Sequence, residues 1–250
     1  MAVHAISWLR QARLGPHLYP LIDDPDEEVR WAAAAGLAVL KDEGSGAPLI
    51  HALATDESAR VRSAAARALG WMRIVASAPD LRLHLRTDVD PEVRSQAARA
   101  LGRLRAHDAL EDLLSAVSDP AAVVRQGAIT ALSGIIDAMD DISQAPASVI
   151  ETFRGRLSDD DAETRALALR ALTKTKASDG FTRCMTALRD PNPGVRVTAA
   201  IGLRRVANPT AVKTLRDHMG DPHPEVAHQI RETIRSLEGL RSPRDADKES

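Results

Sequence analysis

Aromatic residues are scarce in this 250-residue chain, which has three tryptophans, two phenylalanines and one tyrosine. Because 44% of the residues are nonetheless hydrophobic, alanine and leucine supply most of the apolar volume, as in a closely packed helical interior. The chain has one cysteine, Cys184, which excludes an intramolecular disulfide framework and favours a reducing compartment. We expect Cys184 to be a small packing residue rather than a reactive thiol.

Neither sign of charge dominates, and long hydrophobic runs are missing. The chain has 33 basic and 35 acidic side chains and a formal net charge of −2, so no global field attracts nucleic acid or an anionic membrane. Any charge-driven binding must be local. No segment approaches the roughly 20 apolar residues that span a bilayer, and the N-terminus lacks the pattern of a signal peptide. We therefore expect a cytoplasmic protein without a membrane segment.

What the chain does have is a repeated motif, best seen in residues 88–102. Its arginine recurs in register at Arg30, Arg62, Arg94, Arg125, Arg165 and Arg196, with Ala227 at the seventh position. Six residues earlier stands an aspartate each time: Asp24, Asp56, Asp88, Asp119, Asp159, Asp190 and Asp221. The spacings are 32, 32, 31, 40, 31 and 31 residues. Such a period is typical of a stacked repeat array.

The aspartate motif has the features of a helix start. Aspartate or its neighbour can accept hydrogen bonds from unpaired backbone amides, and proline at the next position loses no helical bond. The arginine one turn later has a planar head with five donors, which can bond carbonyls or a neighbouring aspartate between repeats. We therefore predict a structural ladder of Asp24, Arg30, Asp56, Arg62, Asp88, Arg94, Asp119, Arg125, Asp159, Arg165, Asp190 and Arg196.

Each repeat is predicted to be a helical hairpin, with an A helix followed by a B helix that the aspartate motif opens. Seven hairpins fit at about 15–40, 46–72, 77–104, 107–138, 147–175, 177–206 and 208–238. Residues 1–14 are expected to form an N-terminal capping helix, since terminal units must close the core against water. Residues 239–250 are expected to be a disordered tail.

The motif Asp-Pro-x-Pro-x-Val-Arg followed by Ala-Ala-x-Ala-Leu-Gly, best preserved in residues 88–102 and 190–203, resembles the HEAT repeat. It is closest to the short bacterial and archaeal type first named from phycobilin lyases, and the resemblance covers about residues 15–238. It implies an all-α, right-handed α-solenoid whose B helices line the concave face. It also implies a binding scaffold, although one fold serves many functions.

The positions five and nine residues after each ladder arginine should point away from the core, one turn apart. From the second to the sixth repeat they carry Arg67, Trp71, Arg99, Arg103, Thr130, Gly134, Arg170, Lys174, Ile201 and Arg205. Most are basic or tryptophan in a slightly acidic protein. The predicted partner-binding residues are therefore Trp31, Arg67, Trp71, Arg99, Arg103, Arg170, Lys174 and Arg205.

Catalytic and metal-binding patterns are not apparent. None of the eight histidines precedes a glutamate, so the His-Glu dipeptides of the HEAT-like di-iron hydroxylase are missing. His218, His223 and His228 straddle a helix junction and have no cysteine to complete a zinc site. Asp137, Asp140 and Asp141 lie near a loop at 142–147 in the longest repeat interval, but lack the spacing of a calcium loop. We expect the fourth B helix to continue through Asp141, and no metal or cofactor.

Three functions remain open from the sequence. The favoured one is a non-catalytic scaffold that binds an acidic protein segment along the basic concave face. The alternatives are a subunit similar to bilin lyases, which would hold a chromophore, and a nucleic-acid-binding protein. Nucleic acid is less favoured because the net charge is not positive.

Overall fold

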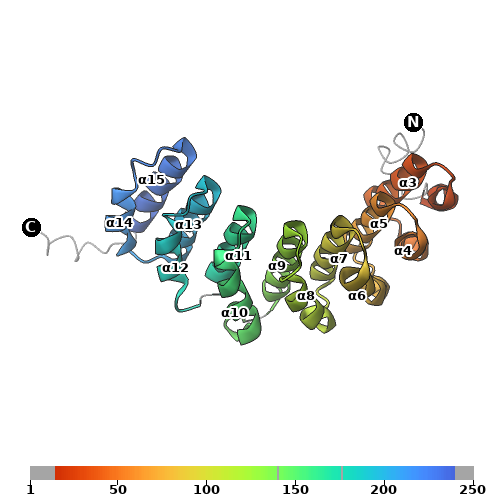
Figure 1. Cartoon of the computed structure of the whole chain (residues 1–250), viewed down its shortest axis with the longest axis horizontal. Coiled ribbons are helices and arrows are strands. Elements are labelled where there is room, and N and C mark those ends of the chain that lie inside the picture. The colour runs from red at the N-terminus through yellow and green to blue at the C-terminus, as the bar shows by residue number, and fades with distance from the viewer. Residues whose placement is uncertain (1–14, 140, 176, 240–250) are drawn as a thin grey trace, which may run out of the picture. The chain divides into compact units, whose positions relative to one another are not determined.

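A computed structural model describes residues 15–139, 141–175 and 177–239, and all regular elements in these ranges are helices. The chain forms two compact units, Met1–Ala138 and Met139–Ser250 (Figure 1). Each unit is a stack of helical hairpins, so the predicted all-α solenoid is confirmed. The predicted capping helix of residues 1–14 and the tail from residue 240 lie outside the described residues.

In the first unit, each hairpin pairs a short A helix with a longer B helix. The A-side elements are α2 (Gly15–Leu18), η2 (Tyr19–Asp23), η3 (Glu43–Ser45), α4 (Gly46–Thr55), η4 (Val75–Ser77), α6 (Ala78–Thr87), η5 (His107–Ala109) and α8 (Leu110–Ala116). The B helices are α3 (Glu27–Leu40), α5 (Ala59–Trp71), α7 (Pro91–Leu104) and α9 (Ala122–Ile136).

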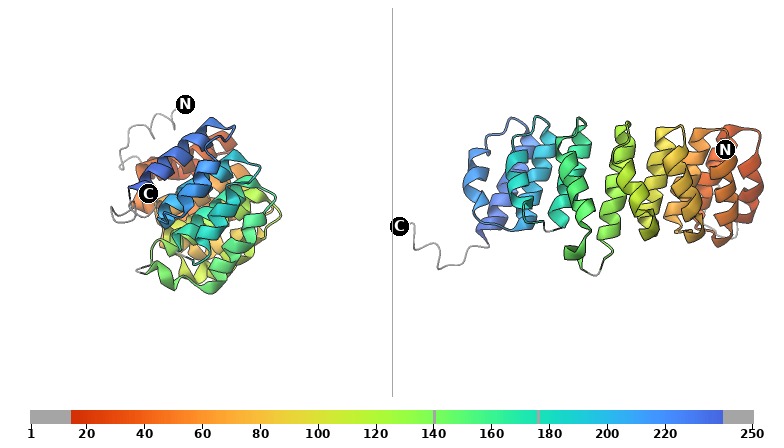
Figure 2. Two further views of the ribbon diagram at one scale, coloured as in Figure 1. Left: turned by 90° about the vertical axis from the view of Figure 1, so that its left-hand side faces the viewer. Right: turned by 60° about the horizontal axis from the view of Figure 1, so that its bottom comes forward.

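The second unit repeats this alternation. Its A-side elements are η6 (Ile142–Gln144), α10 (Ala147–Gly155), η7 (Arg156–Ser158), α12 (Gly180–Ala187) and α14 (Ala211–Asp217). Its B helices are α11 (Ala162–Lys174), α13 (Pro193–Val206) and α15 (Pro224–Glu238). Within each unit the helices stand side by side, as Figure 2 shows.

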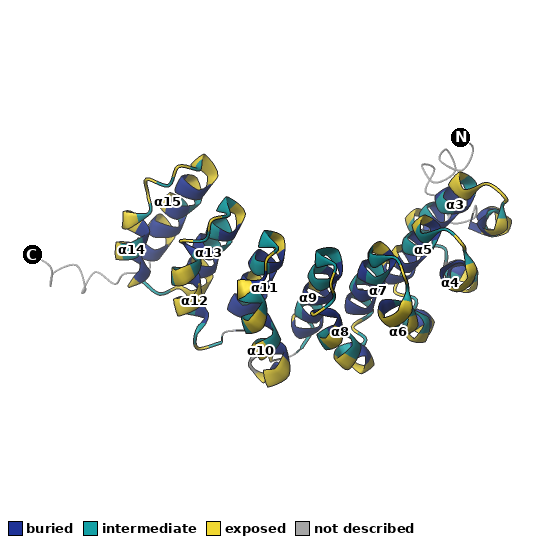
Figure 3. Ribbon diagram, viewed as in Figure 1, coloured by how far each residue is buried: buried dark blue, intermediate teal, exposed yellow. Residues whose placement is uncertain are grey.

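Small residues allow neighbouring B helices to approach closely. A Cβ added at Gly70 of α5 would lie 2.6 Å from the Ala100 Cα of α7, and one at Gly102 of α7 would lie 2.5 Å from the Ala131 Cα of α9. Both distances are shorter than any real carbon contact. The alanines of the repeated motif are buried beside them, and in Figure 3 the dark blue buried residues follow the B-helix faces that meet their neighbours.

The A helices of adjacent repeats in the first unit touch far less than the B helices do. Two ion pairs nevertheless join α6 to α8. Arg82 Nε lies 2.6 Å and Arg86 Nη1 3.4 Å from the two carboxylate oxygens of Asp112. The B helices therefore form the densely packed side of this unit. Each A helix packs mainly against the B helix of its own hairpin.

The helix starts follow from the residue two places after each motif aspartate. That residue is the N-cap, and its side chain accepts a backbone amide hydrogen bond in five of the seven B helices: Asp26, Ser58, Asp90, Asp161 and Asn192. Ala121 and His223 at the other two make no side-chain cap bond. The neighbour of the motif aspartate, rather than the aspartate itself, caps the helix.

The prediction that the fourth B helix continues through Asp141 is wrong. Helix α9 ends at Ile136, with Asp137 as its C-cap, and a turn follows. The negative end of the helix dipole lies at a C-terminus, where acidic side chains such as Asp137 and Asp141 are unfavourable. The extra residues of this repeat interval therefore form a turn and the short η6.

Candidate binding surface

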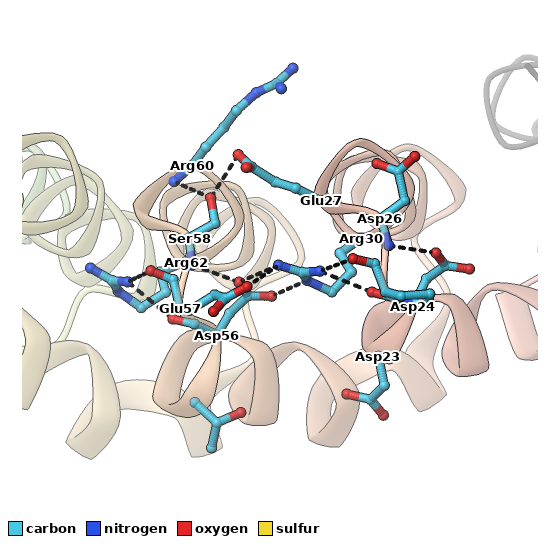
Figure 4. Close-up of polar contacts among 12 residues, drawn as sticks. Asp23, Asp24, Asp26, Glu27, Arg30, Asp56, Glu57, Ser58, Arg60 and Arg62 are labelled. Carbon is cyan, nitrogen blue, oxygen red and sulfur yellow. Dashed lines mark hydrogen bonds and ion pairs between the residues drawn. The ribbon is translucent and has the colours of Figure 1, made fainter.

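The arginine of each motif links two consecutive repeats. Arg30 donates through Nε and Nη2 to the carboxylate of Asp56 in the next repeat, at 2.8 and 3.2 Å. Its Nη1 donates to the carbonyls of Asp24 and Pro25 in its own repeat. Figure 4 shows Arg30 between Asp24 and Asp56. The same pattern joins Arg62 to Asp88 and Arg94 to Asp119 in the first unit, and Arg165 to Asp190 and Arg196 to Asp221 in the second.

The carboxylates of this ladder also accept hydrogen bonds from backbone amides. Asp56 Oδ1, which accepts from Arg30 Nη2, also accepts the backbone amide of Ser58. The amide two residues on donates in the same way to Asp24, Asp88, Asp119, Asp159, Asp190 and Asp221. Arg125 donates Nη1 to the carbonyls of Asp119 and Pro120. The five paired arginine side chains are only 11–15% exposed, so most of each side chain lies in the contact between two repeats.

A second group of arginines lies on the outer face of α5 and α7 in the first unit. Arg67 and Trp71 of α5 are exposed, and Arg99 and Arg103 of α7 are half-buried. The Arg103 guanidinium stacks over the Trp71 ring, 4.4 Å from its centroid. Trp71 is still 61% exposed, so one side of its ring faces solvent. We call these four residues the Arg/Trp cluster.

Among the described residues, no carboxylate forms an ion pair with the cations of the Arg/Trp cluster. Burial lowers the pKa of Arg103, and the nearby positive charges of Arg99 and Arg67 lower it further. Arg103 Nη1 is buried and has no hydrogen-bond acceptor among the described residues. An anionic guest would supply that acceptor and relieve the repulsion among the three guanidinium groups.

Trp31 lies in the first half of α3, beside the start of α5 and away from the Arg103–Trp71 pair at the ends of α5 and α7. The Arg60 guanidinium of α5 stacks over the Trp31 ring of α3 at 4.3 Å from its centroid, and Arg60 forms an ion pair with Glu28. A shallow groove there is lined by Trp31, Arg60, Arg67 and the carboxylates Asp90 and Glu92. In α7, Glu92 lies in the first turn and Arg103 in the last turn, the arrangement that the helix dipole favours.

The stacking of Arg60 on Trp31 is not among the contacts predicted from the sequence. The signal was present, because Arg60 stands two places before one ladder arginine and Trp31 one place after the preceding one. Residues so placed on adjacent B helices meet only if the helices are offset along their axes, and the sequence does not give that offset.

The remaining predicted positions also face solvent. In the second unit, Arg170 and Arg205 are exposed, and Lys174 is half-buried. Thr130 is exposed and Gly134 half-buried at the end of the first unit. The structure therefore brings four of the eight predicted partner-binding residues together in the Arg/Trp cluster, and places Trp31 at the other end of the same face.

The candidates for chemistry are distributed differently. Burial raises the pKa of the Cys184 thiol to about 12, and a Cβ at Gly202 would lie 2.6 Å from its Sγ, so Cys184 packs against α13. No three histidine, cysteine, aspartate or glutamate side chains gather at metal-binding distance in the part of the chain that the structure describes. No helix in this part has the length and apolarity to cross a membrane.

A family model described as HEAT repeats matches residues 15–101, 78–148 and 150–235. The chain belongs to the HEAT-repeat family. No curated protein matches it. Members of this family commonly mediate protein interactions, so a protein-interaction scaffold is the general role that the family suggests.

Solved structures with a similar fold include Escherichia coli YibA, at 19% identity and a TM-score of 0.62, over 91% of this chain and 92% of that one. An engineered protein is similar at 21% identity and a TM-score of 0.59, over 88% of this chain and 67% of that one. The complex of CpcE and CpcF of phycocyanin lyase from Nostoc sp. PCC7120 is similar at 20% identity and a TM-score of 0.58, over 89% and 94%. At these identities the likeness shows the fold.

Proposed function

We propose that this HEAT-repeat protein is a non-catalytic adaptor that binds an acidic, extended protein segment on the Arg/Trp cluster of its first unit. The observation that carries the proposal is the proximity of Arg67, Arg99 and Arg103, which pair with no carboxylate in the described ranges, to one another and to the exposed Trp71. Carboxylates of a guest would accept from these guanidinium groups, and an apolar or aromatic side chain would cover the ring.

The comparison with the ladder arginines supports this assignment. Arg30, like the four other paired ladder arginines, donates four hydrogen bonds to protein oxygens. No described carboxylate pairs with Arg67, Arg99 or Arg103. The helix dipole explains a basic residue in a last turn. It explains Arg103 in the last turn of α7, but not Arg67 and Arg99, which lie before the last turns of their helices and close enough to Arg103 to lower its pKa.

The test uses a fluorescently labelled peptide rich in glutamate and aspartate, without bulky apolar residues. The double variant Arg99→Glu with Arg103→Glu should bind it at least about tenfold more weakly than the wild type, since attraction becomes repulsion. Binding to the wild type should weaken as salt is raised. Helicity by circular dichroism should be unchanged, because neither side chain belongs to the ladder.

The matched control is Lys213→Glu with Arg231→Glu, which makes the same change of charge on exposed positions of the second unit. This variant should bind the peptide within about twofold of the wild type, as screened surface charges act weakly at a distance. Equal losses in both double variants would mean that net charge alone governs binding. If the wild type bound a single-stranded oligonucleotide more tightly than the peptide, the partner of the cluster would be nucleic acid and not an acidic protein segment.

A further inference from the structure

The second unit contains a groove that the repeat pattern does not predict. It lies between η7 and α12 over the start of α13, with a volume of about 620 Å³, within the range of ligand-binding pockets. Its floor is apolar and includes Leu157, Leu169, Met185 and Val195. Leu157 and Met185 pack against the hydrophobic core of this unit but remain partly exposed.

Residue substitutions between repeats explain why the groove is open. Shifting by 71 residues superposes the motif aspartates Asp88 and Asp119 on Asp159 and Asp190. The same shift takes Arg82 and Arg86 of α6 to Phe153 and Leu157, and takes Asp112 of α8 to Arg183. The ion pairs that these positions form between adjacent A helices in the first unit are therefore replaced here. Arg154 of α10 instead binds Asp179 at the start of α12, and Leu157 leaves an apolar side chain at the groove.

The rim of the groove is positively charged. Arg183 and Arg189 are exposed beside it. Arg183 Nε pairs with Asp179, which also binds Arg154. Arg165 in the wall holds both carboxylate oxygens of Asp190. Arg189 has no acidic partner in the described ranges. The carboxylates at the groove are thus already engaged, and an acidic guest would find an uncompensated cation.

We propose that this groove is a second docking site, which binds an acidic amphipathic helix of a partner protein through bulky aliphatic side chains. The apolar floor fits aliphatic side chains spaced three or four residues apart on one helix face. Met185 is a flexible side chain that adapts to such an anchor. Thr182 and Thr186 of α12 also line the groove and are exposed, so a bound helix can contact this face of α12.

The probe is a synthetic helical peptide with leucines on one face and glutamates beside them. Methyl NMR of protein labelled at its methionines should show the Met185 signal, assigned with Met185→Leu, shifting on titration. The signal of Met72, a first-unit methionine that accepts a hydrogen bond from Ser45, should stay in place. Replacing the leucines by serine should abolish the shift, because the apolar anchor is lost.

Two variants locate the charge contribution. Arg189→Glu should weaken binding of the leucine peptide about fivefold to tenfold, and Arg204→Glu, an equally exposed change on α13, should not. An unmoved Met185 signal, or a serine peptide that binds equally well, would overturn the proposal. The proposal would also be overturned if the Arg99→Glu, Arg103→Glu variant lost binding of the leucine peptide while Arg189→Glu bound it as the wild type does. The adaptor role of the Arg/Trp cluster is tested by a different peptide and stands or falls separately.

Discussion

At the scale of single residues, five motif aspartates accept hydrogen bonds both from a backbone amide and from the arginine of the preceding repeat: Asp56, Asp88, Asp119, Asp190 and Asp221. Asp88 shows what this does to its ionisation. Burial alone would raise its pKa, but hydrogen bonds from Arg62, the Asp90 amide and His84 outweigh burial and lower the pKa to about 2. In Asp179, the hydrogen bonds from Arg154 and Arg183 overcome a smaller effect of burial and lower the pKa to about 2 as well.

These lowered pKa values predict loss of stability in acid. A carboxylate whose pKa is about 2 in the folded chain and 3.8 when unfolded contributes fully above pH 3.8. The contribution falls as the pH drops toward 2 and is absent below it. Each group should contribute on the order of 1–2 kcal/mol at neutral pH. Urea unfolding between pH 7 and pH 2 measures this decline, and Asp88→Asn should make it shallower. An equally steep decline in Asp88→Asn would show that other groups govern it.

The residue scale also separates what the sequence can predict from what it cannot. The register of Arg67, Trp71, Arg99 and Arg103 follows from helical periodicity, which places them on the solvent side of their helices. The stacking of Arg103 on Trp71 depends on the distance between two helices that are distant in sequence. Periodicity within one helix carries no information about that distance.

At the scale of elements, the glycine of the repeated motif decides how closely two B helices pack. Gly70→Ala would drive a Cβ to within 2.6 Å of the backbone of Ala100, and backbone cannot move aside as a side-chain end can. We expect a loss of about 1–3 kcal/mol in the free energy of unfolding, the usual cost of overpacking, measured by urea denaturation.

The matched control is Gly155→Ala in the last turn of α10, where an added Cβ meets nothing within 4 Å. Alanine favours a helix over glycine by up to about 1 kcal/mol, so this variant should be as stable as the wild type or more stable. A destabilised Gly155→Ala, or a neutral Gly70→Ala, would show that close helix packing does not explain the motif glycine.

Element boundaries were predictable where a capping signal marks them. The B-helix starts follow the aspartate motif because the N-cap chemistry is local. The end of α9 was mispredicted because its apolar residues continue to Met139, and apolar periodicity does not register the unfavourable dipole at a C-terminus. The groove beside α12 could not be predicted for another reason. It depends on Phe153 and Leu157 in one repeat together with Arg183 in the next.

At the scale of the whole molecule, the chain divides into two compact units, and its spectroscopic probes divide with it. All three tryptophans belong to Met1–Ala138, and the single cysteine belongs to Met139–Ser250. In stacked repeats, stability is a sum of local terms and nearest-neighbour terms. A change in one unit should therefore act first on the probe within that unit.

We predict that Arg94→Ala lowers the urea midpoint of tryptophan fluorescence more than that of Cys184 labelling by a thiol reagent. The substitution removes the bonds to Asp119, Asp88 and Val89, at about 1–3 kcal/mol for acceptors left unpaired. Arg196→Ala, which removes the equivalent bonds of the second unit, should reverse the order. Midpoints that shift together in both variants would indicate a single cooperative unit.

The uneven packing of A and B helices has a mechanical consequence for the first unit. Its B helices are joined by backbone-level contact at Gly70 and Gly102 and by the arginine ladder, whereas its A helices share few contacts. The stacked B helices α3, α5, α7 and α9 should therefore resist bending of this unit more strongly than the A helices on the opposite edge. We expect bending to change the spacing of the A helices first and to leave the Arg/Trp cluster, which lies on the B helices α5 and α7, nearly unchanged.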